Sequence, residues 1–359
     1  MKKKLAFILA AAMSLSLLGG CIKTPPAADP VPPAASSSAD QSAGSSADAS
    51  SSADVSGEEI PTINVMVLSG PTGVGAAQMM TTHVLNSSPE VFYDFKVAAE
   101  NPEVTSALIN GDADIAAVAT NVAANLVNKT DGGIQVLAIN TLGVLYVLEK
   151  GDSVHSMGDL RGKTVYAPST AKGANPEYIF NHLLLENDVD PSQVTMEWMT
   201  PQEITAKMAS SEEGICLLPV PAATALLVKD AGVREAISLS DEWDKLGQGA
   251  LAQGCVVART DFVEEHPELV ESFLEEYSES IFYMMDITNV AETASMVAAL
   301  GIAPNETIAA AAIPQCNLTY ITGQEMKDIL EQFFSVMYQA DPSSIGGAMP
   351  FDSFYYGAE

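Results

Sequence analysis

A glycine-containing loop is the first candidate for chemistry in this sequence. Residues 69–75 read SGPTGVG and lie between a β-rich run and a helical one. Gly70 and Gly75 have the spacing of a phosphate-binding P-loop, in which lysine and then serine or threonine follow to hold the phosphate charge and Mg²⁺. Ala76 and Ala77 occupy those positions here, so the sequence disfavours nucleotide hydrolysis.

The same loop keeps the groups that bind oxygen atoms of a ligand. Glycines allow close approach of the backbone, and free N–H groups at a helix N-terminus attract anionic or carbonyl oxygens. Since two hydroxyl groups are also present, we predict a ligand-binding set of Ser69, Gly70, Thr72 and Gly73. The alternative is a tight strand-to-helix turn with no ligand.

A second loop repeats this arrangement in the next part of the chain. It offers Ser169, Thr170, Lys172 and Gly173 after another β-rich run. Lys172 is the only formally positive residue in either loop, and we predict that it pairs with an anionic group of the ligand. A solvated surface lysine is the alternative.

Three further residues complete the predicted ligand site. Asn121 and Pro219 each follow an apolar run, and loops at the carboxyl ends of parallel strands meet at one edge of a sheet. Asn121 has helix capping as its alternative role. Tyr146 or Tyr166 is expected to pack against a planar or apolar part of the ligand, although Tyr166 lies inside a strand and is more typical of a core.

Residue patterns for catalysis or metal binding are missing from the sequence. It has no nucleophile elbow, HExxH motif or paired catalytic carboxylates, so we predict no enzymatic activity and no cofactor. No metal is expected, because metal-ligand spacing is lacking among His83, His155, His182 and His266. Buried thiols without a disulfide framework are predicted for Cys216, Cys255 and Cys316.

The elements that position these loops occur twice, 99 residues apart. The run 63–68, its loop and the helix 76–85 correspond to the run 164–167, its loop and the helix 177–185. Asn101 and Thr200, each before proline, are expected to cap the next helix of each copy. A buried apolar run and a further helix follow in both copies. The pattern predicts an α/β fold with parallel strands, although all α/β proteins repeat such units and the equal offset has chance as its alternative.

The last part of the chain is expected to return to the first copy. We predict a strand over 249–258, a long helix from His266-Pro267, and a final helix with a capping box of Thr322 and Glu325. Two crossovers then fall near 140–146 and 248–255. The expected organisation is a first lobe over 60–143, a second lobe over 144–247, and a return to the first lobe with C-terminal helices over 248–359.

The N-terminal segment predicts export and anchoring. Three lysines, an apolar run over 5–18 and Leu18-Gly19-Gly20-Cys21 resemble a bacterial lipoprotein signal, with residues 1–20 removed and Cys21 lipidated. An ordinary secretory signal is the alternative. Residues 21–59 are too poor in apolar residues to fold and read as a linker. The net charge of −30 disfavours nucleic acid as a partner.

Several motifs in order resemble the substrate-binding proteins of ABC importers, in the nitrate, sulfonate, taurine and thiamine-precursor group. They are the lipobox, the strand ending in SGPTG, the Gly-Asp-x-Asp-Ile unit at 111–115, GDLRGKTV at 158–165 and VEEHPELV at 263–270. The resemblance implies the type II periplasmic-binding-protein fold, with two α/β lobes joined by two hinge crossovers. It also implies a monomer that clamps a small polar or anionic organic ligand and delivers it to an ABC permease.

Two other functions stay open at the level of sequence. A secreted enzyme on the same two-lobed scaffold would need turnover of a small substrate. A tethered sensor or adhesion module would need a protein partner and a broad exposed apolar patch.

Overall fold

The computed structural model describes residues 61–85 and 91–359. The predicted signal peptide, the predicted lipidation site Cys21 and the predicted linker lie outside the described residues. In the part of the chain that is described, no helix is both long enough and apolar enough to cross a membrane.

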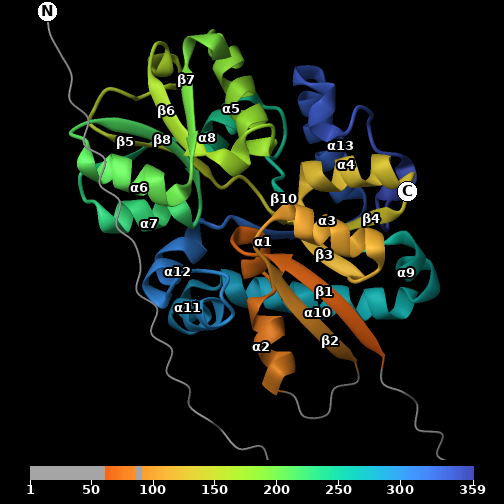
Figure 1. Ribbon diagram of the computed structural model, residues 1–359. Coiled ribbons are helices and arrows are strands. Elements are labelled where there is room, and N and C mark those ends of the chain that lie inside the picture. Colours follow the sequence, from red (N-terminus) through yellow and green to blue (C-terminus); the bar gives the residue numbers. More distant parts are fainter. Residues whose placement is uncertain (1–60, 86–90) are drawn as a thin grey trace, which may run out of the picture. The chain divides into compact units, whose positions relative to one another are not determined.

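The first sheet has the strand order β11-β4-β10-β3-β1-β2 (Figure 1). Its strands are β1 Thr62–Leu68, β2 Phe92–Ala98, β3 Ile115–Ala119, β4 Ile134–Thr141, β10 Gly254–Arg259 and β11 Leu318–Ile321. Strand β1 is parallel to β2 and β3, whereas β10 is antiparallel to β3 and β4. The first sheet therefore takes in strands from both the beginning and the end of the described chain.

The second sheet is built in the same way from the middle of the chain. Its order is β7-β6-β8-β5-β9, with β5 Leu145–Lys150, β6 Thr164–Pro168, β7 Thr195–Met199, β8 Gly214–Pro219 and β9 Val233–Ser238. Strand β6 is parallel to β7 and β8, and β5 is antiparallel to β8 and β9. Each sheet thus contains three neighbouring parallel strands. Beside them lies one antiparallel strand that comes directly after a crossover, β10 in the first sheet and β5 in the second.

The repeat predicted from the sequence is confirmed in the strand register. Val67 on β1 pairs with Ala117 on β3, and 99 residues later Tyr166 on β6 pairs with Cys216 on β8. Because both residues of the pair shift by the same number of positions, equivalent residues of the two copies point to equivalent faces of their sheets. The two halves therefore present equivalent loops at equivalent strand ends.

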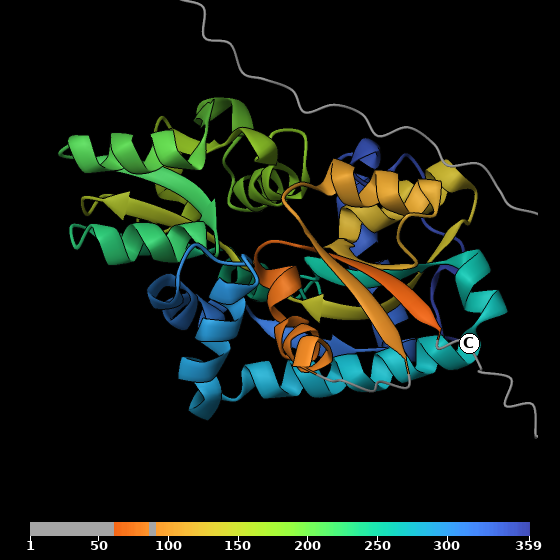
Figure 2. The ribbon, with the colours of Figure 1, turned by 60° about the horizontal axis from the view of Figure 1, so that its bottom comes forward.

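Helices cover both faces of each sheet. On the first sheet, the alternating side chains of β1 divide between two apolar layers. One layer contains α3 Asn101–Asn110, α4 Thr120–Thr130 and α13 Gly323–Ala340; the other contains α2 Ala77–Leu85, α10 Pro267–Met285, α11 Val290–Ala299 and α12 Glu306–Ala312. Figure 2 shows α10 running along the face that carries α2. Helix α9, Thr260–Glu265, follows β10 directly.

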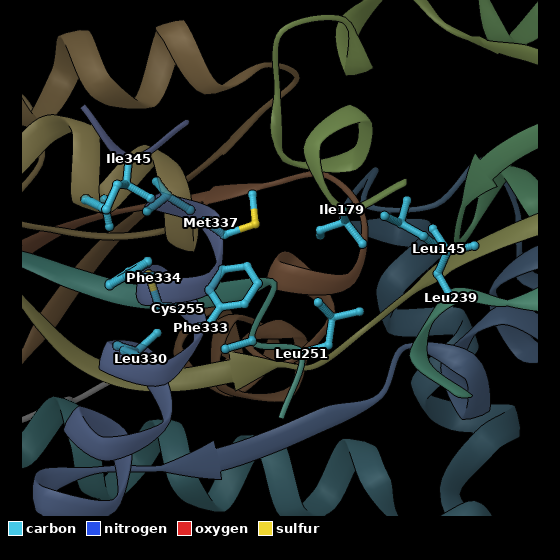
Figure 3. Packing of buried hydrophobic residues seen from close by; sticks show 14 of the residues in the cluster. Leu145, Ile179, Leu239, Leu251, Cys255, Leu330, Phe333, Phe334, Met337 and Ile345 are labelled. Atoms are coloured by element: carbon cyan, nitrogen blue, oxygen red, sulfur yellow. The ribbon is translucent and has the colours of Figure 1, made fainter. Parts of the chain in front are cut away.

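The second sheet is covered in the same manner. Helices α5 Asn175–Glu186 and α8 Leu239–Leu246 pack on one face, and α6 Pro201–Ser210 and α7 Ala222–Lys229 pack on the other. The cores of the two halves join where Trp243 of α8 meets Phe333 of α13, with ring centroids 5.7 Å apart. Figure 3 shows Ile179 of α5 together with Phe333 and Met337 of α13, which belong to the same cluster of buried residues.

Three local predictions are wrong. Asn101 lies inside α3 and does not cap it, because Glu100 is the N-cap residue. Thr322 is the N-cap of α13 but accepts no side-chain capping bond, so the predicted capping box is absent there. The strand predicted over 249–258 begins only at Gly254, and the residues before it form the second crossover. The capping box of Thr200 with Glu203 at α6 is present.

Candidate functional site

The carboxyl ends of the parallel strands in the two sheets meet at the crossovers. Strand β4 ends at Thr141 and β5 begins at Leu145, so three residues connect the two sheets. Leu145 pairs with Pro219, which puts the end of β8 at the same place. The Val220 N–H donates to the Val144 carbonyl at 3.0 Å. We call these two sets of strand ends, with the loops that follow them, the facing edges.

The facing edges approach each other directly at the predicted loops. A Cβ placed on Gly70, in the loop after β1, would lie 3.9 Å from Cδ of Pro221, in the loop after β8. The φ angle of Gly70 is 104°, a conformation that L side chains rarely adopt. Glycine at this position is therefore favoured by the backbone turn, whereas a Cβ there would be at ordinary van der Waals distance from the other half.

The two crossovers are hydrogen-bonded to each other. Oε1 of Gln253, in the second crossover, accepts the Val144 N–H of the first crossover at 2.6 Å. The Gln253 N–H donates to the Thr141 carbonyl at 3.0 Å, and the Thr120 hydroxyl donates to the Ala252 carbonyl at 2.7 Å. These bonds fix the start of α4 and the ends of β3 and β4 against the crossover segments.

The first predicted loop is more ordered than the sequence indicates. Residues Pro71–Val74 form a short helix, α1, in which the Gly70 carbonyl accepts the N–H groups of Gly73 and Val74. Among the predicted binding residues, Gly73 therefore has its N–H engaged within the loop. Gly73 is buried, and a Cβ there would lie 2.2 Å from the Leu68 carbonyl oxygen. Ser69 is exposed and Thr72 is half-buried at the facing edge.

Asn140 holds this loop in position. Its Nδ2 donates to the Thr72 carbonyl at 3.2 Å and to the Tyr277 hydroxyl at 2.8 Å. A Cβ on Gly254 would lie 2.7 Å from Oδ1 of Asn140 and 2.5 Å from Cγ2 of Thr72. Only glycine leaves the space that the Asn140 amide and the Thr72 methyl group occupy.

Buried polar atoms without a hydrogen-bond partner within the described residues gather at the facing edges. Six of the nine such atoms are there, namely Asn121 Oδ1, Asn140 Oδ1, Thr141 Oγ1, Asn175 Oδ1 and Nδ2, and Ser240 Oγ; the other three are Asn101 Oδ1, Arg259 Nε and Tyr355 Oη. Because Asn121 lies inside α4, the alternative of helix capping is wrong for it. Buried polar groups are normally paired, so a cluster of unpaired ones at strand ends indicates a binding site. Both halves contribute to this cluster.

Among these five residues, only Asn121 is predicted from the sequence. Asn140 and Thr141 end an apolar strand, a position that could have marked them, since polar residues directly after buried strands belong to ligand-facing loops. Asn175 precedes proline and resembles a helix cap. Ser240 gives no such sign, because it lies in a polar helix of ordinary composition.

The second predicted loop lies at the edge of the second sheet. Residues Ser169–Ala171 form one turn of 3-10 helix, and Ser169, Thr170 and Lys172 are exposed. Lys172 has no ion pair within the described residues. The Gly173 N–H donates to Glu177 Oε2 at 2.5 Å, so this loop, like the first one, uses part of its backbone internally.

The two tyrosines differ in their surroundings. Tyr146 is half-buried beside the first crossover, and its pKa is raised by burial, then by the charges of Glu235 and Asp241 and by Cys316. Tyr166 lies under Lys207, whose Nζ is 4.2 Å from the ring centroid. Tyr146 therefore lies at the facing edges, in a negatively charged environment, whereas Tyr166 packs against a surface lysine.

Two surface cavities lie away from the predicted residues. One is polar and is lined by Asn64, Lys96, Glu103, Asn110 and Asp112. The other is lined by Met284, Ile287, Val290, Ile313 and Pro314, at the end of α10. Neither is lined by a residue of the predicted site. As expected from the sequence, Cys216, Cys255 and Cys316 are buried free thiols.

Comparisons with known proteins agree with this architecture. The model of the family described as NMT1/THI5 like matches residues 90–288. No curated protein matches the sequence. Many solved structures share the fold, which confirms the predicted two-lobed α/β class.

Three of these structures show the extent of the likeness. An ABC transporter structure from Parabacteroides distasonis is 23% identical, with a TM-score of 0.67, and the match covers 82% of this chain and 98% of that one. The periplasmic aliphatic sulphonate binding protein SsuA from Escherichia coli is 14% identical, with a TM-score of 0.64 and coverage of 81% and 92%. The ligand binding component of an ABC-type import system from Staphylococcus aureus, solved with zinc bound, is 12% identical, with a TM-score of 0.63 and coverage of 82% and 96%.

Proposed function

The chain belongs to the NMT1/THI5-like family, and from this premise we propose that it is the solute-binding component of an ABC importer. Its fold is the type II periplasmic-binding-protein fold. In this proposal a small organic ligand binds between the facing edges and is then delivered to a membrane permease. The protein performs no covalent chemistry.

One observation carries the proposal. Unpaired, buried polar side chains lie at the facing edges of both halves, represented by Asn121 in the first and Asn175 in the second. A ligand that contacts both edges at once stabilises the arrangement in which they are close, because only that arrangement offers all the contacts. The proposal includes the hydroxyl groups of Ser69, Thr72, Ser169 and Thr170, which lie in the segments that follow β1 and β6.

Anchoring is a separate part of the proposal. We propose that Cys21 carries lipid and that the protein acts outside the cytoplasm as a tethered monomer. The support for this anchoring is the segment before Cys21, which resembles a bacterial lipoprotein signal. A Cys21→Ala variant that stays in the membrane fraction would contradict it, whereas release into the medium or periplasm would support it.

A capture experiment separates this function from the two others. The purified protein is incubated with a metabolite mixture, washed and denatured, and the released compounds are identified by mass spectrometry. An unmodified small molecule supports a solute-binding protein. A chemically altered product would indicate an enzyme, and the absence of any bound compound would favour a sensor or adhesion module.

A further inference from the structure

Positive charge is nearly absent from the facing edges. The lysines and arginines of the described residues lie elsewhere, with two exceptions. Lys150, Arg161, Lys163, Arg234 and Arg259 are at the opposite strand ends, and Lys129 and Lys229 end helices that lead away from the edges. Lys96, Lys207 and Lys327 are paired with Asp94, Glu197 and Asp352. The exceptions are Lys172, which is exposed, and Lys245, which is paired with Glu242 at 2.6 Å.

Several donors at the facing edge of the first half are already engaged within the protein. The N–H groups of Gly73 and Val74 bond to Gly70, and Asn140 Nδ2 bonds to Thr72 and Tyr277. A fully ionised oxyanion needs several donors or a cation when it leaves water, since a buried charge without partners costs several kcal/mol. The donors that remain without a partner at the edge of the first half are neutral hydroxyl groups, such as that of Thr141, and no lysine or arginine among the described residues accompanies them there.

Acceptors, by contrast, are unpaired. The Oδ1 atoms of Asn121 and Asn140 have no donor within the described residues, and both side chains are more than nine-tenths buried. The carboxylates of Glu235 and Asp241 add negative charge beside Tyr146. Asn175, in the second half, has both its acceptor and its donor unpaired, so it can bind a ligand group of either kind.

We infer that the ligand presents N–H or O–H donors and carries no net negative charge, so that it is a neutral or cationic small molecule and not a sulfonate, nitrate or similar oxyanion. This inference rests on the proposed function and narrows it. Asn121 Oδ1 and Asn140 Oδ1 accept hydrogen bonds from the ligand, and the carboxylates near Tyr146 favour a positive group over a negative one. The earlier expectation that the ligand can be anionic, with Lys172 as its partner, is replaced.

Two measurements on the full chain test the inference. In the first, nitrate and ethanesulfonate at millimolar concentration are compared with the molecule recovered by capture, using isothermal titration calorimetry. We expect no heat of binding from either anion, and a recovered molecule that is neutral or cationic with N–H or O–H donors. Micromolar binding of either anion, or recovery of an anion, would overturn the inference and leave the proposed function intact.

The second measurement uses a matched pair of variants on α4. Asn121→Ala removes the unpaired acceptor, and we expect the dissociation constant of the recovered molecule to rise about tenfold. Asn128→Ala removes an amide that bonds to Ile345 and Ala348 instead, and should leave that constant unchanged. Equal constants for the Asn121→Ala variant and the unsubstituted protein would overturn the inference. Recovery of no small molecule at all would overturn the proposed function, and this inference with it.

Discussion

The Gln253 side chain accepts the Val144 N–H at 2.6 Å and so joins the two crossovers between the sheets. Gln253 is almost fully buried. Any movement of one half against the other passes through these two segments, because the chain crosses between the sheets only there within residues 91–359. Closure around a ligand therefore depends on bonds such as this one.

Gln253→Ala should destabilise the protein by about 1–3 kcal/mol, because the buried Val144 N–H loses its acceptor. Chemical denaturation measures the change in the free energy of unfolding. Gln339→Ala, in which the lost amide is exposed at the end of α13, is the matched control and should change stability little. Equal stability of the two variants would show that the crossover bond is unimportant.

Gly254→Ala should also be destabilising, by about 1–3 kcal/mol, because the new methyl group overpacks the start of β10. Its Cβ would lie 2.5 Å from Thr72 Cγ2 and 2.9 Å from Thr141 Cβ. Gly158→Ala is the control, since the nearest atom to its Cβ, Ser156 Oγ, is 3.5 Å away. Thermal unfolding compares the two, and a Gly254→Ala protein as stable as the Gly158→Ala protein would contradict the packing described around Asn140.

The sequence was sufficient to predict elements whose cause is local. The cap at Thr200 depends on neighbours in the chain, and it is present as predicted. The repeat at an offset of 99 residues was also predictable, because the apolar pattern that decides which face each side chain takes is written in the sequence.

Features with non-local causes escaped prediction. A side chain at position 254 would collide with Thr72 and Asn140, which are far away in the sequence, so the need for glycine there is not a local feature. Asn140 belongs to the candidate site because its Nδ2 bonds to Thr72 and Tyr277 and its Oδ1 has no partner within the described residues, contacts that the sequence does not reveal. The loop after β1 contains the short helix α1 because Gly70 accepts two N–H groups, which the glycine pattern alone does not reveal.

Stability should fall in acid through Glu149. Burial by itself would raise the pKa of this carboxyl group, but hydrogen bonds from Ser153 and Val154 and the charge of Arg234 together lower it below its usual 4.5. The unfolded chain then binds the proton more readily, so the stabilisation is present above about pH 4.5 and is lost as the pH falls below it.

The Glu149→Gln variant tests this pH dependence. Its deficit in unfolding free energy relative to the unsubstituted protein should be largest at neutral pH and should shrink as the pH is lowered. Glu264→Gln, at an exposed position on α9, should show no such trend. A deficit for Glu149→Gln that is constant between pH 7 and acid would contradict the assignment, which denaturation curves at several pH values can establish.

The three thiols should be unreactive in the folded protein. Burial raises the pKa of Cys216 and of Cys316 to about 12, and it raises that of Cys255 as well, so very little thiolate exists at pH 8. Peptide mass spectrometry after iodoacetamide treatment should find these cysteines unlabelled in buffer and labelled in guanidinium chloride. Rapid labelling of any of them in buffer would indicate that its half of the protein opens readily.

The most direct test of the central claim removes one exposed hydroxyl group from each facing edge. Isothermal titration calorimetry with the captured small molecule compares Ser69→Ala in the first half, Thr170→Ala in the second, and Ser106→Ala on α3 as the control. If the ligand is held between the two halves, both edge variants should raise the dissociation constant by about 5- to 10-fold and the control should not. Unchanged affinity in either edge variant would mean that one half binds the ligand alone, which contradicts the account.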